Sequence, residues 1–198
     1  MQFFKNHFES KINFFNINTP QNLVHGKVNV VNVWQEPVKI EFGKTDTKIG
    51  EYAIKSLEAA TKALIEGTID VLVTAPINKH NIQSEKFNFP GHTDYLAKSL
   101  NGKSLMFMIS DGLRVGLLTD HVPLKDASNF ITEALIIEKI ATVTKSLKQD
   151  FGIRKPKVAV LAINPHAGDN GVIGNEDDAV LKPTLEKIKA DGHLVYGP

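Results

Sequence analysis

The chain has 198 residues, 42% hydrophobic and 23% charged, which is enough apolar material to bury a globular core. Its 23 Lys and Arg residues balance 22 Asp and Glu residues, and this near-neutral charge argues against a nucleic-acid-binding protein. The apolar stretches fall short of the roughly 20 residues that a membrane span needs, and the absence of cysteine excludes disulfides and thiolate metal sites. A soluble protein of the reducing cytoplasm fits this composition.

The first part of the chain is predicted to begin with strands and continue with a long helix. Residues 27–34 and 37–43 are predicted strands separated by a short turn. Residues 46–66 carry apolar side chains at helical spacing, and Gly67 follows at a position where helices commonly end. Residues 68–76 form an apolar run rich in β-branched residues, which is typical of a strand buried on both faces.

The rest of the chain continues this alternation. The sequence "GHTDYL" indicates a helix start at His92 or Thr93, and the Asp-Gly pair at 111–112 predicts a hairpin between residues 104–109 and 113–118. A helix, a strand, a helix and a starting strand are then expected at residues 131–150, 157–164, 177–192 and 193–198. Helices between apolar strands predict an α/β fold with αβα layers around a mostly parallel sheet.

Three predicted strands are followed by loops that contain histidine. In open α/β sheets ligands bind beyond the carboxyl ends of the strands, where these loops meet. His92 lies in the first loop region, His121 follows the second strand and His166 the third. A single histidine near a strand end is commonly a surface or structural residue, whereas for three in equivalent places a functional and a structural role are equally open. Imidazole pairs suit Zn²⁺, Co²⁺, Mn²⁺ or Mg²⁺, although two ligands do not complete a coordination sphere.

The stretch "NPHAGDNGVIGNEDD" around His166 has an alternative, purely structural explanation. Its glycines, Gly168, Gly171 and Gly174, are expected to build a loop with positive backbone dihedrals. The acids at 176–178 are expected only to begin the next helix, where they oppose its dipole. Lys79 also has a functional and a structural explanation. It could bind a phosphate or carboxylate, or it could be one of many solvated lysines.

Four segments resemble one enzyme family in their order and spacing. They are "VTAPINKHNIQ", "FPGHTDYLA", "LRVGLLTDHVPLKDAS" and "VAVLAINPHAGDNGVIGNED", and together they resemble the 4-hydroxythreonine-4-phosphate dehydrogenase family of pyridoxal phosphate biosynthesis. The resemblance spans about residues 28–198. It implies a fold like that of isocitrate and isopropylmalate dehydrogenases, a homodimer and an active site between two domains.

The resemblance also implies an activity and roles for particular residues. The family oxidises 4-phosphooxy-L-threonine with NAD⁺ and a divalent metal, and the product loses carbon dioxide to give 3-amino-2-oxopropyl phosphate. By position in the motifs, His121 and His166 match metal ligands, and His92 and Thr93 match substrate-binding residues. Lys79 lies in a family-typical segment and is expected near the substrate. No catalytic or NAD-binding residue is assigned.

Residues 1–198 are accordingly expected to be the central part of a two-domain dehydrogenase, without the family's flanking segments. The family has a "GDPxGIG"-like turn before this region, and a third metal histidine, phosphate-binding residues and most of the NAD site after it. Two alternatives stay open. One is a related dehydrogenase of another phosphorylated four-carbon hydroxy acid, and the other is a non-catalytic core that dimerises and binds metal weakly.

Overall fold

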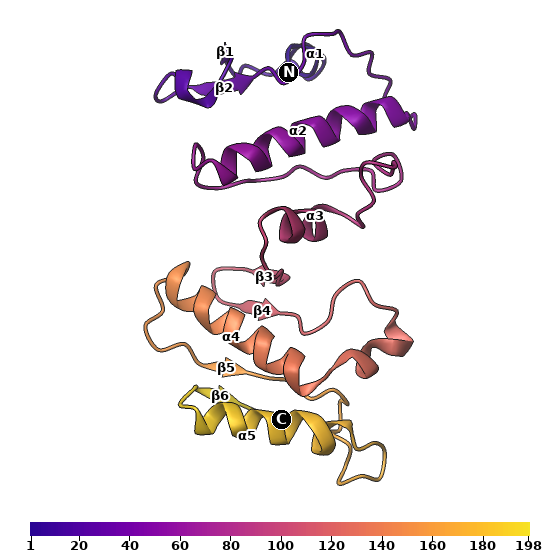
Figure 1. The fold of residues 1–198 in the computed structure, drawn as a ribbon, viewed down its shortest axis with the longest axis vertical. Coiled ribbons are helices and arrows are strands. Elements are labelled where there is room, and N and C mark those ends of the chain that lie inside the picture. The colour runs from indigo at the N-terminus through magenta and orange to yellow at the C-terminus, as the bar shows by residue number, and fades with distance from the viewer. The chain divides into compact units, whose positions relative to one another are not determined.

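The computed structural model describes residues 1–198, which divide into two compact units, Met1–Ser104 and Leu105–Pro198. Helices and strands follow one another along the chain in both units (Figure 1). This alternation confirms the predicted α/β class. No helix in the structure is both long enough and apolar enough to cross a membrane.

The first unit contains three helices and one pair of strands. Their bounds are α1 Gln2–His7, β1 Phe14–Ile17, β2 Val28–Val31, α2 Thr47–Ile65 and α3 His92–Ser99, with a short 3-10 turn at Pro20–Asn22. β1 and β2 pair in parallel, with Phe14 opposite Val28 and Ile17 opposite Val31. The helix predicted at 46–66, the helix start in "GHTDYL" and a strand within 27–34 are confirmed, whereas α1 and β1 were not predicted.

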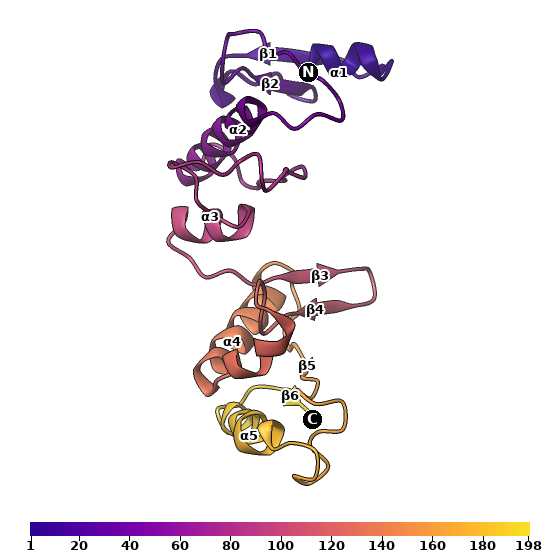
Figure 2. The same cartoon turned by 90° about the vertical axis from the view of Figure 1, so that its right-hand side faces the viewer.

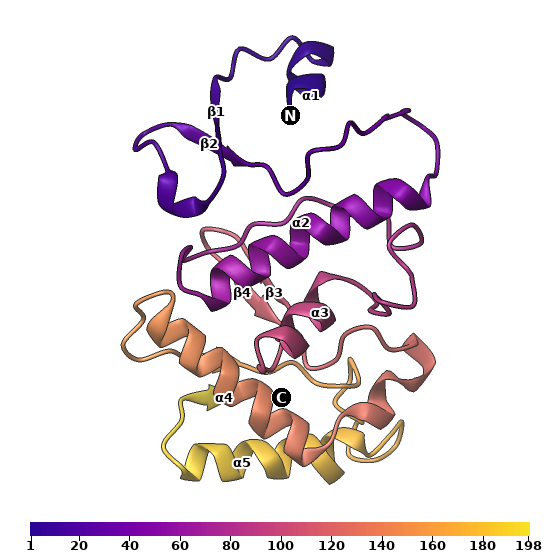
Figure 3. The same cartoon turned by 45° about the horizontal axis from the view of Figure 1, so that its top comes forward.

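The core of the first unit lies between α2 and the segment that follows it. Ile54 and Leu57 of α2 are buried together with Ile82 and Phe87. Phe87 also lies in ring contact with Phe89 and Tyr95, at centroid distances of 5.2 and 5.3 Å, and Tyr95 belongs to α3. Figure 1 and Figure 3 show the segment after α2 running along that helix before it enters α3. Aromatic packing therefore connects α2, the following loop and α3.

Two predicted strands of the first unit, 37–43 and 68–76, are wrong. Neither segment pairs with another strand, and the side chains of Val71 and Val73 are 72% and 88% exposed. A strand exists only when a neighbour accepts and donates its backbone hydrogen bonds, and β-branched composition does not supply that neighbour. Within the first unit only β1 and β2 form such a ladder.

The second unit contains a hairpin, two long helices and a second parallel strand pair. The bounds are β3 Phe107–Ile109, β4 Arg114–Gly116, α4 Glu133–Gln149, β5 Val158–Ala159, α5 Lys182–Ala190 and β6 Val195–Tyr196, with a 3-10 segment at Leu124–Phe130 and a π-helical turn at Asp177–Leu181. β3 and β4 are antiparallel, with Phe107 opposite Gly116, which confirms the predicted hairpin. β5 and β6 are parallel, with Val158 opposite Val195.

The core of the second unit lies where α4 and α5 meet the parallel pair. Ile136 and Ile140 of α4 are buried against Leu185 and Ile188 of α5 and Val195 of β6. In Figure 2 both helices lie on the left of β5 and β6. The predicted strand 157–164 is reduced to its first part, and Leu161 beyond it is 86% exposed. The strands are hydrogen-bonded in three separate pairs, so a single layered sheet stays a prediction.

The N-cap of α4 provides a test of this local structure. Thr132 precedes the helix, and its hydroxyl oxygen accepts a hydrogen bond from the Leu135 backbone N–H at 3.2 Å. We expect Thr132→Ala to lower the free energy of unfolding by about 1 kcal/mol, measured by urea denaturation. Thr142→Ala on the same helix is the control, because it removes only a bond to the carbonyl four residues earlier and raises helix propensity. Equal losses in both variants would refute the capping role.

Candidate functional site

The three residues predicted to bind substrate meet at the start of α3. Gly91 is the residue before this helix, and His92 and Thr93 are its first two residues. A Cβ atom built on Gly91 would lie 3.6 Å from Cε and 4.0 Å from Nζ of Lys79. The Lys79 ammonium group therefore lies over the beginning of α3. A lysine at a helix N-terminus is an arrangement suited to a phosphate or carboxylate group.

Hydrogen bonds within the preceding loop hold the backbone of Lys79. The Asn78 side-chain oxygen accepts from the backbone N–H groups of His80 and Asn81, at 3.0 and 3.1 Å. The Gln83 side-chain amide donates to the carbonyl oxygens of Lys79 and Phe89, at 3.1 and 2.9 Å. The sequence did not reveal Asn78 or Gln83, although an asparagine commonly accepts from the backbone N–H two residues later in a turn.

His121, a predicted metal ligand, lies in the loop after β4. Its side chain is exposed, and its backbone φ of 52° is in the left-handed region. This region is uncommon for residues other than glycine and costs about 1 kcal/mol or more, so the surrounding loop must hold the conformation. The structure thus places His121 at a constrained turn beyond a strand end, as the sequence predicted for its position.

His166, the second predicted metal ligand, lies in the loop that follows β5. The Asn164 side-chain oxygen accepts from the His166 backbone N–H at 2.9 Å, and the Asn164 amide donates to the Ile173 carbonyl oxygen at 3.1 Å. Asn164 therefore connects the two ends of the loop. The His166 side chain itself is exposed.

The glycines of this loop occupy positions where the backbone φ is positive. Gly168, Gly171 and Gly174 have φ values of 78°, 89° and 142°, as expected from the sequence. Gly168 also closes the loop, because a Cβ there would lie 2.5 Å from the Gly174 carbonyl oxygen. Ala167, Asp169 and Asn170 share the left-handed conformation, with φ of 50°, 44° and 53°. The loop is therefore a tight left-handed turn that only its hydrogen bonds and close backbone contacts can maintain.

Asp177 has a larger role than the sequence predicted. Its side chain is fully buried, and its carboxylate oxygens accept from the backbone N–H groups of Ile163 and Asn164 at 2.8 and 3.0 Å. The carboxylate thus fixes the helix start to the strand end that carries His166. The expectation that this acid only begins a helix is wrong. Helical spacing could have revealed it, since Asp177, Leu181 and Leu185 are four residues apart and share the buried face.

The predicted metal ligands do not form a complete site within this chain. No group of three or more His, Asp or Glu side chains is arranged to hold a metal ion. A catalytic zinc commonly has three protein ligands in addition to water or substrate. His121 and His166 offer donors of a suitable kind, but a coordination sphere would need further ligands.

In fold, the chain is similar to solved structures of 4-hydroxythreonine-4-phosphate dehydrogenases. It matches 4-hydroxythreonine-4-phosphate dehydrogenase from Klebsiella pneumoniae with a TM-score of 0.82 and 26% identity, over 96% of this chain and 58% of that one. A protein described as a putative 4-hydroxythreonine-4-phosphate dehydrogenase from Salmonella typhimurium matches with a TM-score of 0.81 and 28% identity, over 96% and 59%. The family model described as pyridoxal phosphate biosynthetic protein PdxA matches residues 2–198. The chain belongs to the PdxA family.

The sequence relatives carry the same enzyme name as these solved structures. The chain is 46% identical to 4-hydroxythreonine-4-phosphate dehydrogenase of Bacteroides thetaiotaomicron, over 94% of this chain and 52% of the relative. It is 36% identical to the enzyme of the same name from a Sulfurihydrogenibium species, over 94% of this chain and 58% of the relative. The chain therefore spans about half the length of the curated relatives that it matches.

Proposed function

We propose that this chain is part of an NAD-dependent dehydrogenase that oxidises 4-hydroxythreonine 4-phosphate during pyridoxal phosphate biosynthesis. Membership of the PdxA family supports the reaction, since two of its relatives carry this enzyme's name. The observation that carries the proposal is the position of the Lys79 ammonium group over Gly91, beside His92 and Thr93. An isocitrate-dehydrogenase-like layering of the complete fold, a homodimer and a cytoplasmic location belong to the same proposal.

In this proposal the start of α3 binds and orients the substrate. Lys79 supplies a positive charge for an anionic group, and the first N–H groups of the helix add hydrogen-bond donors and a favourable dipole. His92 and Thr93 supply an imidazole and a hydroxyl group at the same place. His121 and His166 are proposed as ligands of a divalent metal, Zn²⁺, Mg²⁺, Co²⁺ or Mn²⁺, in a site that other residues must complete.

The test is the kinetics of NADH formation by the complete protein with 4-hydroxythreonine 4-phosphate. We expect Lys79→Met to raise KM about tenfold, because a charge-assisted hydrogen bond to the substrate is lost. Lys86→Met is the control, since Lys86 is an exposed lysine of the same loop and outside the proposed site. A complete protein that is inactive with this substrate, or a control with the same rise in KM, would refute the proposal.

The substrate class is tested in the same assay. Erythronate 4-phosphate and threonate 4-phosphate are phosphorylated four-carbon hydroxy acids that lack the amino group. Higher kcat/KM with either acid than with 4-hydroxythreonine 4-phosphate would favour the related dehydrogenase over the reaction proposed here.

A further inference from the structure

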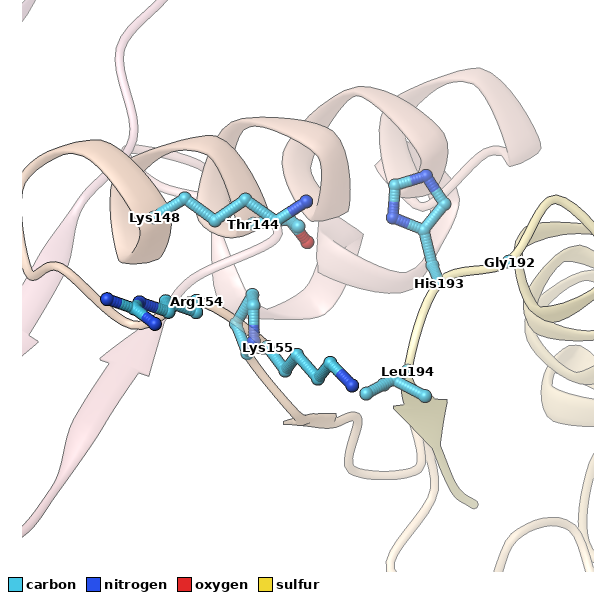
Figure 4. Close-up of a pocket in the computed structure, with 8 residues that line it drawn as sticks. Thr144, Lys148, Arg154, Lys155, Gly192, His193 and Leu194 are labelled. Atoms are coloured by element: carbon cyan, nitrogen blue, oxygen red, sulfur yellow. The ribbon is translucent and has the colours of Figure 1, made fainter.

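A pocket of about 300 Å³ lies in the second unit at the amino ends of β5 and β6. Three segments line it: the last turns of α4, the residues before β5 and the turn between α5 and β6 (Figure 4). The lining residues are Thr144, Lys148, Arg154, Lys155, Pro156, Gly192, His193 and Leu194. The loop with His166 follows the opposite, carboxyl end of β5, so the pocket is separate from the predicted metal ligands.

The lining of this pocket is cationic. Lys148, Arg154 and Lys155 contribute three positive charges, His193 adds an imidazole, and no acidic residue lines the pocket. Some exposed lysines elsewhere in the chain pair with carboxylates, as Lys182 does with Asp178 at 2.5 Å and Lys187 with Glu133 at 2.7 Å. The three cations of the pocket form no ion pair. Their charges are therefore available to an anion.

Thr144 adds a second, independent observation. This residue is only 8% exposed and lies on the buried face of α4 with Ile136 and Ile140. The hydroxyl groups of Thr61, Thr142 and Thr184 each donate to the carbonyl oxygen four residues earlier, at 2.8, 2.9 and 2.6 Å. Thr144 makes no such bond, and it lines the pocket. A hydroxyl that is not used within the protein can donate to or accept from a ligand in the pocket.

The framework of the pocket is fixed without help from its cations. The Val158 N–H donates to the Leu194 carbonyl oxygen at 2.9 Å, which connects the first residue of β5 to the residue before β6. The end of α4 is closed by backbone bonds, among them Ile153 N–H to the Leu147 carbonyl oxygen at 2.9 Å. The cationic side chains are thus not needed as hydrogen-bond partners for these backbone groups. Figure 4 shows the Lys155 side chain extending toward Leu194 and the Arg154 guanidinium extending away from His193.

We propose that this pocket binds a small phosphorylated molecule through its phosphate group. Ammonium, guanidinium and hydroxyl donors around one space are the groups that recognise phosphate oxygens in proteins. A volume of about 300 Å³ is at the lower end of small-molecule pockets and exceeds the needs of a single ion. The proposal does not depend on the dehydrogenase reaction.

The first experiment is a titration of the chain followed by amide NMR spectra, with inorganic phosphate and glycerol 3-phosphate in separate series. We expect saturable shifts at the amides of Lys155 and Leu194 in both series. Tighter binding of the ester would identify an organic phosphate as the ligand class, and tighter binding of inorganic phosphate would identify the free ion. Absence of saturation, or shifts confined to residues 79–93, would overturn the proposal.

Variants then test the individual groups. We expect Lys155→Ala to weaken phosphate binding about tenfold and Thr144→Val to weaken it several-fold, as expected for the loss of hydrogen bonds to a charged ligand. Lys145→Ala is the matched control, because Lys145 is an exposed lysine of α4 outside the pocket. An equal effect of Lys145→Ala would show non-specific charge attraction and would refute the site. Unchanged affinity in both pocket variants would refute it as well.

Discussion

Replacement of Asp177 by alanine is expected to lower the free energy of unfolding by about 3 kcal/mol. The buried carboxylate accepts from the backbone N–H groups of Ile163 and Asn164, and both donors would lose their partner inside the protein. The loss is measured by urea denaturation. Because Asn164 also fixes His166 by a side-chain bond, the His166 amide resonance should shift in the variant.

The neighbouring acid provides the control for this prediction. Asp178 is exposed and forms a surface ion pair with Lys182, so Asp178→Ala should cost less than about 1 kcal/mol. Asp177→Asn should lie between the two, because the amide keeps one acceptor oxygen and turns an N–H group toward a backbone donor. Similar losses for Asp177→Ala and Asp178→Ala would show that the buried carboxylate has no special role.

Gly50→Ala is expected to destabilise the first unit by about 2 kcal/mol, although alanine is the better helix former. A Cβ atom at this position would lie 2.0 Å from the Asn81 carbonyl oxygen and 2.6 Å from its carbon atom. Both atoms belong to the backbone, so the loop must move away from α2. That movement also displaces Lys79, two residues earlier, from the start of α3.

The matched control is Ser56→Ala, which adds helix propensity at an exposed position of α2 without a clash. We expect Ser56→Ala to leave stability unchanged or slightly higher in urea denaturation, whereas Gly50→Ala lowers it. In amide NMR spectra, Gly50→Ala should shift the resonances of residues 78–83, and Ser56→Ala should not. A stabilised Gly50→Ala variant would mean that α2 and the loop do not approach as closely as described.

Some parts of the candidate site were predictable from the sequence, because they depend only on residues close together in the chain. The position of a histidine after a strand, the glycines of the loop at 164–178 and the helix start at His92 follow from motifs and backbone preferences that act over a few residues. The proximity of Lys79 to Gly91 was not predictable from spacing, because residues 80–90, an irregular loop, lie between them. Asp177 was misjudged for the same reason, since its partners lie thirteen and fourteen residues earlier.

The sequence by itself determined the helices α2 and α4, the hairpin of β3 and β4, and the family. Helical periodicity, an Asp-Gly turn and motif order are local properties, and they act through hydrogen bonds between near neighbours. Only the tertiary structure decided which apolar runs became strands, because a ladder requires a partner segment. It alone also decided that Asp177 is buried and that Thr144 faces a cationic pocket, since burial depends on contacts between segments distant in the chain.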